Sequence, residues 1–174
     1  MPIYDLIIIG ACPAGITAAV YAARKRMDFL VVSRDIVGQA AWSGDIENYL
    51  GYQFITGREL MAKFEEHMGN YNIRLHEGEE VNWLKKQGDI ISVRTGKAEY
   101  QARTVIIASG KRSKELGVPG EKELKNRGIT YCATCDGPLF SDKEVAVIGG
   151  GNSALDAVLQ LMQIARSVSI INNT

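Results

Sequence analysis

The sequence predicts an α/β fold: a doubly wound dinucleotide-binding (Rossmann-like) domain with a small antiparallel meander, followed by the start of a second dinucleotide-binding domain. Three observations predict this class. A strand–turn–helix–strand pattern occurs twice, 139 positions apart, and each turn is built of small residues. Between the two copies, three short segments alternate apolar and polar residues, as antiparallel strands do.

The composition is that of an ordinary globular chain. The 174 residues are 46% hydrophobic and 23% charged, enough to bury a substantial core. The net charge is zero and the only basic block is residues 24–26, so we expect no nucleic-acid partner. Three cysteines are too few for a disulfide framework, which favours a reducing compartment and a cytoplasmic protein.

Residues 6–23 contain no charge, so a membrane span or a signal peptide has to be considered. Asp5 precedes this stretch where a signal peptide has basic residues, and Gly10, Pro13 and Gly15 interrupt it. A strand, a turn and a helix explain the stretch better, and we expect no membrane segment.

The first copy of the repeat is DLIIIGACPAG (5–15), with a helix over 16–26 and a second strand over 29–32. The second copy is EVAVIGGGNSA (144–154), with a helix over 155–166 and a strand over 167–171. Such a turn places backbone N–H groups and a helix N-terminus where a pyrophosphate can bind. The candidate cofactor-binding residues of the two turns are Gly10, Cys12, Pro13, Ala14 and Gly15, and Gly149, Gly151, Asn152, Ser153 and Ala154.

Neither turn matches the dinucleotide fingerprint fully. Cys12 replaces the middle glycine of the first turn, and Ala154 replaces the last glycine of the second, a common variant. We interpret Cys12 as a small buried apolar residue rather than a reactive thiol, although its Cβ and sulfur are expected to weaken nucleotide binding.

The segment between the copies predicts an amphipathic helix after Thr56-Gly57 with Leu60, Met61 and Phe64 on its apolar face, then a strand over 73–78. A meander follows over 81–86, 89–95 and 98–104, and a buried parallel strand over 104–110 is expected to end beside the first turn. Residues 110–128 suggest a linker between domains. His67 and His76 are interpreted as surface residues, and we predict no metal site.

With these elements in place, the sequence closely resembles the low-molecular-weight thioredoxin reductases, which are flavoprotein disulfide reductases. The resemblance spans almost the whole chain in family order. It is carried by DLIIIGACPAG, VGQAAWSGDIENYLGY (37–52), TVIIASG (104–110), YCATCDG (131–137) and VAVIGGGNSA (145–154).

The resemblance implies that residues 1–112 are the amino-terminal part of an FAD-binding domain. Residues 113–174 would begin an inserted NAD(P)-binding domain that carries a redox cysteine pair. Val37 departs from the family, where a glycine usually stands. Beyond the first turn, the residues expected around the FAD are Ser33, Gly38, Gln39, Asn48, Ala108, Ser109 and Gly110.

Cys132 and Cys135 form a Cys-x-x-Cys motif with three physical readings. A zinc clip needs a second pair of ligands, but the only other cysteine, Cys12, lies 120 positions upstream. A structural staple over so short a loop removes little unfolded-state entropy. A redox couple is the natural interpretation, because a helix start favours the thiolate and small neighbours leave room for attack.

In the mechanism that the resemblance implies, a nicotinamide nucleotide reduces FAD and the flavin reduces the Cys132–Cys135 disulfide. Cys135 would face the flavin and Cys132 would attack the disulfide of thioredoxin or a thioredoxin-like protein. Asp136 would protonate the leaving thiolate; a helix-capping role for Asp136 is the alternative. The full-length protein would be a homodimer. Two alternatives stay open: a reductase of a peroxiredoxin or other thiol protein, and a catalytically silent fragment.

The identity of the electron donor depends on the end of the second unit. NADPH-linked members of the family carry a basic His-Arg-Arg stretch where this chain has Asn172-Asn173-Thr174. Because no positive charge there would neutralise a 2′-phosphate, NADH or a non-nicotinamide donor competes with NADPH. The second unit stops after one strand–helix–strand crossover, so we expect the 174-residue chain alone not to turn over.

Overall fold

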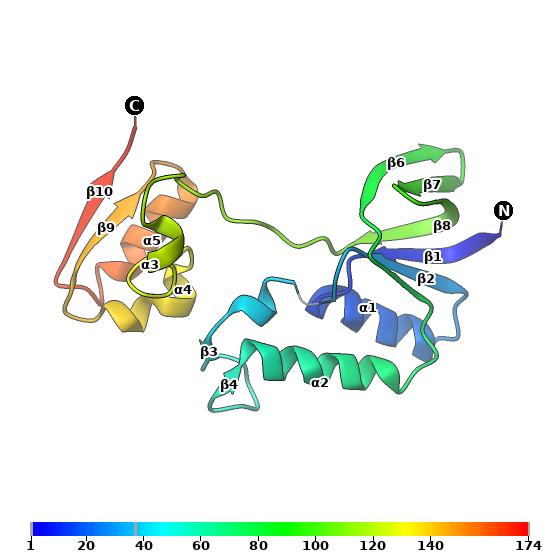
Figure 1. Cartoon of the computed structure of the whole chain (residues 1–174), viewed down its shortest axis with the longest axis horizontal. Coiled ribbons are helices and arrows are strands. Elements are labelled where there is room, and N and C mark those ends of the chain that lie inside the picture. The colour runs from blue at the N-terminus through cyan, green and yellow to red at the C-terminus, as the bar shows by residue number, and fades with distance from the viewer. Residues whose placement is uncertain (1, 37, 174) are drawn as a thin grey trace. The chain divides into compact units, whose positions relative to one another are not determined.

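The computed structural model describes residues 2–36 and 38–173; Val37 and Thr174, which the sequence analysis singled out, lie outside the described residues. The chain forms two compact units, Met1–Arg112 and Ser113–Thr174 (Figure 1). In the described part of the chain, no helix combines the length and the apolar character needed to cross a membrane.

The first unit is built on a six-stranded mixed sheet with the order β5-β2-β1-β8-β7-β6 (Figure 1). Strands β5, β2, β1 and β8 are parallel, and β7 and β6 continue the sheet as an antiparallel meander. The predicted α/β class with a small meander is therefore confirmed. The strand bounds are β1 Ile3–Ile9, β2 Phe29–Ser33, β5 Leu75–Glu77, β6 Val81–Gln87, β7 Ile90–Thr95 and β8 Glu99–Ile107.

Two strands were expected over 98–104 and 104–110, and this prediction is wrong: β8 includes parts of both segments. The structure has one strand that pairs antiparallel with β7 at Ala102 and parallel with β1 at Ile107. No glycine or proline stands between these positions, so the backbone stays extended across both neighbours. The end of the strand is not buried, because Ile106 and Ile107 are 41% and 68% exposed.

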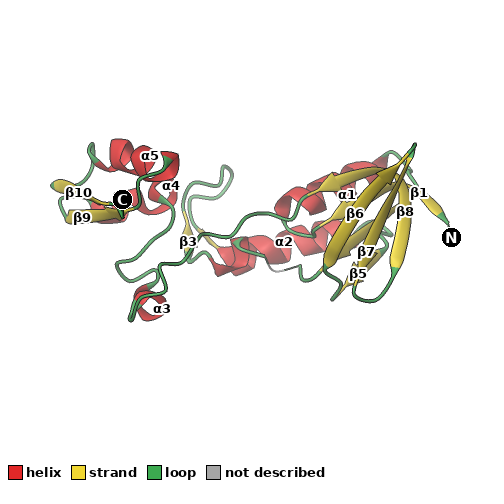
Figure 2. Cartoon of the chain, turned by 90° about the horizontal axis from the view of Figure 1, so that it is seen from above, coloured by secondary structure: helices red, strands yellow, loops and turns green. Residues whose placement is uncertain are grey.

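Two helices, α1 (Pro13–Arg24) and α2 (Gly57–Gly69), lie on one side of this sheet (Figure 2). Helix α1 begins three residues before the expected start, because Pro13 tolerates the first helical turn, where its missing N–H is not needed. It ends at Arg24, and Arg26 has a positive φ of 56°, which a helix does not allow.

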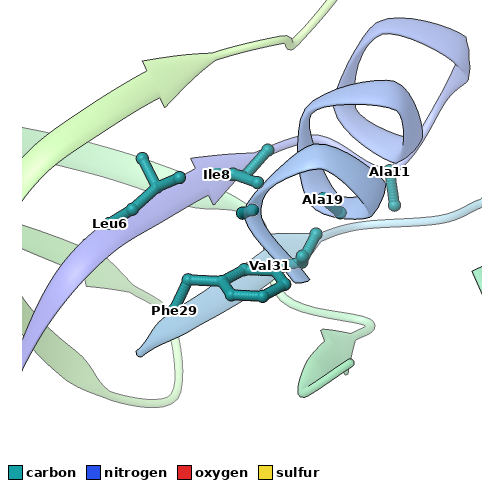
Figure 3. Packing of buried hydrophobic residues seen from close by; sticks show 7 residues of the cluster. Leu6, Ile8, Ala11, Ala19, Phe29 and Val31 are labelled. Atoms are coloured by element: carbon teal, nitrogen blue, oxygen red, sulfur yellow. The ribbon is translucent and has the colours of Figure 1, made fainter. Parts of the chain in front are cut away.

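The core between α1 and the sheet combines branched residues on the strands with alanines on the helix (Figure 3). Ala19 and Ala22 of α1 let the helix backbone approach the sheet closely. On the opposite face, Val93 of the meander helps to cover the central strands. The first cluster is Leu6, Ile8, Ala11, Ala19, Ala22, Phe29 and Val31, and the second is Tyr4, Ile7, Leu30, Val32, Val93 and Ala102.

Helix α2 begins at Gly57, one residue before the predicted start, and its predicted apolar face is confirmed. Thr56 and Glu59 form a capping box, and Leu60 and Met61 are buried while Phe64 is half-buried. The turn η1 (Ala40–Trp42) and the two-residue strands β3 (Asp45–Ile46) and β4 (Ile55–Thr56) precede it. These elements were not predicted, because they are too short to show a period.

The second unit contains the repeat copy β9 (Glu144–Ile148), α5 (Asn152–Leu161) and β10 (Ser167–Ile171), with β9 and β10 parallel. The two copies have the same strand register: Leu6 pairs with Phe29 in the first, and Val145 pairs with Val168 in the second. Helix α5 ends at Leu161, five residues before the expected end.

Three short elements precede β9, namely α3 (Glu121–Leu124), α4 (Ala133–Asp136) and η2 (Gly137–Phe140). The expected linker over 110–128 therefore contains α3, and Glu121 is only 3% exposed. The linker assignment is therefore wrong for residues 121–124. This segment has no apolar face in the sequence, but it is fixed by a buried carboxylate that accepts hydrogen bonds.

Candidate functional site

The first turn requires glycine at two positions. Gly10 has a φ of +104°, and a Cβ there would strike the carbonyl oxygen of Ala108. A Cβ on Gly15 would strike the carbonyl oxygen of Gly10. The N–H of Ala108 donates to the carbonyl of Ile9 at 2.8 Å, so the end of β8 lies beside the turn, as predicted.

Ser33 lies at the end of β2, but its hydroxyl is engaged within the protein. The N–H of Ala11 donates to Ser33 Oγ at 3.0 Å, and Ser33 Oγ donates to the carbonyl of Asp35 at 2.6 Å. Ser33 is 7% exposed. Its side chain therefore fixes the shape of the turn and presents no free hydroxyl to a ribose.

Asp35, in the loop after β2, is a residue that sequence reasoning missed. Its Oδ1 accepts a hydrogen bond from the N–H of Gly38 at 3.0 Å, and this bond, helped by Arg34, holds the pKa of the carboxyl below its usual range. The signal in the sequence was an acid two residues after the second strand, close to where dinucleotide-binding units carry one.

Cys12 precedes α1 with a φ of −102°, a conformation open to any residue, which explains why glycine is not required here. The side chain is half-buried, whereas the sequence analysis expected it to be buried. A Cβ on Gly38 would strike Cys12 Sγ, so the sulfur lies against the loop after β2. Burial first, and the Asp35 carboxylate second, raise the pKa of this thiol.

The first turn has the features that a pyrophosphate needs: a strand end, a tight glycine turn and the first N–H groups of α1, which have no acceptor within the helix. Pro13, Ala14 and Gly15 form the first turn of α1. Gln39, Ser109 and Gly110 are exposed. Asn48 lies in the exposed loop between β3 and β4, and among the described residues no hydrogen bond links it to the turn.

The second turn repeats this geometry. Gly149 has a φ of +127°, and its N–H donates to Ile171 at 2.8 Å, the counterpart of the 2.8 Å bond from Gly10 to Val32. Gly151 precedes α5, whose first residues are Asn152, Ser153 and Ala154. A Cβ on Gly150 would strike the side chain of Asn172, so Asn172 lies against the turn.

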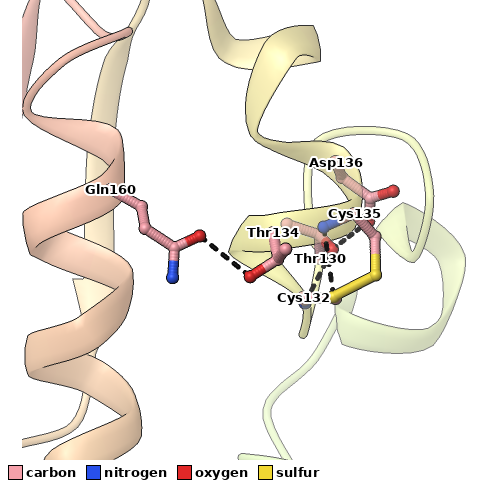
Figure 4. The surroundings of a disulfide bond; sticks show 6 residues. All are labelled: Thr130, Cys132, Thr134, Cys135, Asp136 and Gln160. Atoms are coloured by element: carbon pink, nitrogen blue, oxygen red, sulfur yellow. Dashed lines mark hydrogen bonds between the residues drawn. A yellow bond between two sulfur atoms is a disulfide. The ribbon is translucent and has the colours of Figure 1, made fainter. Parts of the chain in front are cut away.

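Cys132 and Cys135 form a disulfide, and Cys12 is free, so the predicted pairing is confirmed (Figure 4). Cys132 is the residue before α4, and its Sγ accepts a hydrogen bond from the N–H of Cys135 at 3.2 Å. Cys135 is exposed and Cys132 is half-buried. An N–H donor aimed at a sulfur stabilises that sulfur when it becomes a thiolate.

Asp136 is held close to the disulfide through Thr130. The hydroxyl of Thr130 donates to Asp136 Oδ2 and accepts from the N–H of Cys132 at 3.1 Å (Figure 4). Asp136 directly precedes η2 but makes no side-chain capping bond, so the capping alternative is wrong. Thr130 was missed, although a hydroxyl two residues before a helix N-cap commonly bonds nearby backbone. Thr134 donates to Gln160 Oε1 at 2.9 Å and ties α4 to α5.

His67 is exposed, and His76 Nδ1 lies 2.8 Å from the hydroxyl of Tyr100. Within residues 2–36 and 38–173, no three His, Cys, Asp or Glu side chains gather in a group that could hold a metal ion.

Comparison with known proteins agrees with this geometry. The sequence model of the pyridine nucleotide-disulphide oxidoreductase family matches residues 4–174. Thioredoxin reductase of Bacillus subtilis (strain 168) is 45% identical over 171 residues, which are 98% of this chain and 54% of that protein. The chain thus spans about half the length of the curated relatives that it matches.

Solved structures give the same result. Thioredoxin reductase from Streptococcus pyogenes MGAS5005 has a TM-score of 0.87 at 42% identity, over 97% of this chain and 55% of that one. A ferredoxin-flavin thioredoxin reductase from Clostridium acetobutylicum has a TM-score of 0.59 at 34% identity, over 98% of this chain and 60% of that one. The two glycine turns, the disulfide and the family match together show that this chain belongs to the pyridine nucleotide-disulphide oxidoreductase family.

Proposed function

We propose that the chain is the amino-terminal part of an FAD-dependent thioredoxin reductase. Residues 1–112 bind FAD through the first turn, and residues 113–174 begin the NAD(P)-binding domain. The observation that carries the proposal is the Cys132–Cys135 disulfide. Thr130 links this disulfide to Asp136, because its hydroxyl accepts from the Cys132 N–H and donates to the Asp136 carboxylate. The similarity to thioredoxin reductases from Bacillus and Streptococcus supports the choice of substrate.

The first turn fits FAD through Gly10, Gly15 and the start of α1, which would hold the pyrophosphate. When bound, FAD would supply the two-electron chemistry that links the electron donor to the disulfide. Asp35 and Ser33 would act indirectly, by fixing the backbone around the turn.

The thiol chemistry uses the residues of the redox motif. With the pair reduced, the Cys132 thiolate attacks one sulfur of the substrate disulfide, forms a mixed disulfide and expels the other substrate sulfur as a thiolate. Asp136 gives that thiolate its proton. The Cys135 thiolate then attacks Cys132, re-forms the protein disulfide and releases the second substrate thiolate, which takes its proton from water.

A second candidate concerns the donor. Asn172 lies against the second turn and, like Asn173, carries no charge to neutralise a 2′-phosphate. The similar protein from Clostridium acetobutylicum is described as a ferredoxin-flavin thioredoxin reductase. NADH or reduced ferredoxin therefore competes with NADPH as the electron source.

The test is a chimera that joins residues 1–174 to the remaining carboxyl-terminal residues of the Bacillus subtilis relative, compared with the 174-residue chain. We expect the chimera to bind FAD and to reduce thioredoxin with one of the three donors, and the chain alone to give no turnover. Cys132→Ser and Cys135→Ser should each abolish turnover without loss of FAD. If the chimera binds FAD but reduces only a peroxiredoxin, the proposed substrate changes from thioredoxin to a peroxiredoxin.

The assembled protein is further proposed to be a cytoplasmic homodimer. Sedimentation of the chimera at micromolar concentration tests this, since a monomer would contradict it.

A further inference from the structure

The buried carboxylate of Glu121 contacts the residue that precedes the redox motif, and it takes no part in the hydrogen bonds of Thr130 and Asp136. Tyr131 directly precedes Cys132, and its hydroxyl donates to Glu121 Oε1 at 2.6 Å. Glu121 is the first residue of α3 and is only 3% exposed. The proposed function gives neither residue a role.

Glu121 is fixed in place by the backbone of the preceding loop. The N–H of Leu116 donates to Oε1 at 2.8 Å, and the N–H of Gly117 donates to Oε2 at 2.7 Å. Gly117 and Gly120 have positive φ values of 73° and 84°, so the loop wraps around the carboxylate in a conformation that glycine allows. A carboxylate held by three donors is a firm anchor for the phenol.

The contact keeps its charge state over the physiological range. The hydrogen bond from Tyr131 is the main cause that holds the pKa of Glu121 below its usual range. The same bond raises the pKa of Tyr131 to about 12. At neutral pH the carboxylate is therefore ionised and the phenol keeps the proton that it donates.

Two contacts thus restrain the backbone at Cys132. Thr130 accepts the N–H of Cys132 at 3.1 Å, and the side chain of the adjoining Tyr131 is fixed to Glu121. The ammonium of Lys125 lies 5.5 Å from the centre of the Tyr131 ring and further restricts it. These contacts restrict the backbone that carries Cys132.

We propose that Glu121 and Tyr131 are positioning residues that hold Cys132 near Cys135 and thereby set the reduction potential of the pair. The inference rests on the proposed redox role of the two cysteines. Forming the disulfide from the dithiol depends on how often the two sulfurs meet, so a looser Cys132 makes the disulfide easier to reduce.

The test measures that potential in the 174-residue chain. The chain is equilibrated in glutathione buffers of graded ratio, where two glutathione thiols reduce one protein disulfide to two thiols and become one glutathione disulfide. Acid quenching, alkylation and mass spectrometry of the peptide with Cys132 and Cys135 give the reduced fraction. We expect Tyr131→Phe to lower the equilibrium constant for disulfide formation about tenfold, which raises the potential by about 30 mV.

Tyr100→Phe is the matched control, because Tyr100 donates to Glu79 Oε2 at 3.0 Å in the first unit. It should leave the potential unchanged. Glu121→Ala removes the same contact from the other side, and the double variant should shift the potential no further than the larger single variant.

Two outcomes separate the two proposals. A wild-type pair that glutathione reduces reversibly, with a Tyr131→Phe potential equal to that of Tyr100→Phe, overturns the positioning role alone. A wild-type pair that is not reversibly reduced overturns the redox function and this inference with it.

Discussion

Replacing Ser33 with alanine tests whether its hydroxyl stabilises the first turn or is available to bind a ligand. In the structure Ser33 Oγ accepts from the buried N–H of Ala11 at 3.0 Å and donates to the carbonyl of Asp35 at 2.6 Å. The variant leaves both groups without this partner. We expect the first unit to lose stability even when no cofactor is present.

The size of the loss follows from burial. Ala11 is fully buried, so its orphaned N–H costs about 1–3 kcal/mol, whereas Asp35 is only partly buried and water can replace its donor. The free energy of unfolding should fall by about 2 kcal/mol. For a unit of this size, that lowers the melting temperature by about 8 °C.

Tryptophan fluorescence provides the assay, because both tryptophans, Trp42 and Trp83, belong to the first unit. Ser109→Ala is the matched control: Ser109 follows β8 near the same turn and is exposed, so its melting temperature should stay within about 2 °C of wild type. If Ser33→Ala and Ser109→Ala have the same melting temperature, the Ser33 hydroxyl does not stabilise the turn and the role given to Ser33 is refuted.

Three further predictions concern Cys12, the α2 cap and the donor. Burial raises the pKa of Cys12, so iodoacetamide should alkylate Cys12 more slowly than it alkylates the thiol of glutathione at pH 8. The alkylation rate of Cys12 should keep rising above pH 9. Equal rates for the two thiols would contradict this. Thr56→Ala should destabilise the first unit by about 1 kcal/mol at pH 7. Hydrogen bonds from the Thr56 N–H and hydroxyl lower the pKa of Glu59. The stabilisation that they give is therefore present above the usual Glu pKa and is lost as the pH falls through the lowered pKa. The difference in unfolding free energy between variant and wild type should shrink in acid, and a difference that stays constant would contradict this. In the chimera, NADPH should not exceed NADH by ~100-fold in kcat/KM, about 2.7 kcal/mol; such a preference would show that Asn172 and Asn173 do not govern the donor.

The repeat was predictable because its signals are local. The apolar runs of β1 and β9 and the glycines that follow them specify a strand, a turn and a helix within a few residues, and the structure reproduces the two turns with the same bond from Gly10 and Gly149. The disulfide was predictable for the same reason, since Cys132 and Cys135 are three positions apart.

The contacts that sequence reasoning missed join residues whose meeting depends on the folded chain. Ala11 meets Ser33 across 22 positions only after β1 and β2 have paired. Glu121 read as one charge among many in a polar stretch, yet the loop at Gly117 and the phenol of Tyr131 turn it into a buried anchor. A charged residue in sequence shows no sign of the donors that will surround it.

The central claim is that Cys132 and Cys135 act as a redox pair with Cys132 toward the substrate, and a trapping measurement tests it most directly. In a Cys12→Ala background, reduced Cys135→Ser and Cys132→Ser variants are mixed with a thioredoxin that keeps one active cysteine, activated as its thionitrobenzoate mixed disulfide. Release of the thionitrobenzoate anion gives the rate at which each remaining thiolate captures the thioredoxin. We predict capture at least tenfold faster through Cys132 than through Cys135; equal rates, or faster capture through Cys135, would contradict the assignment.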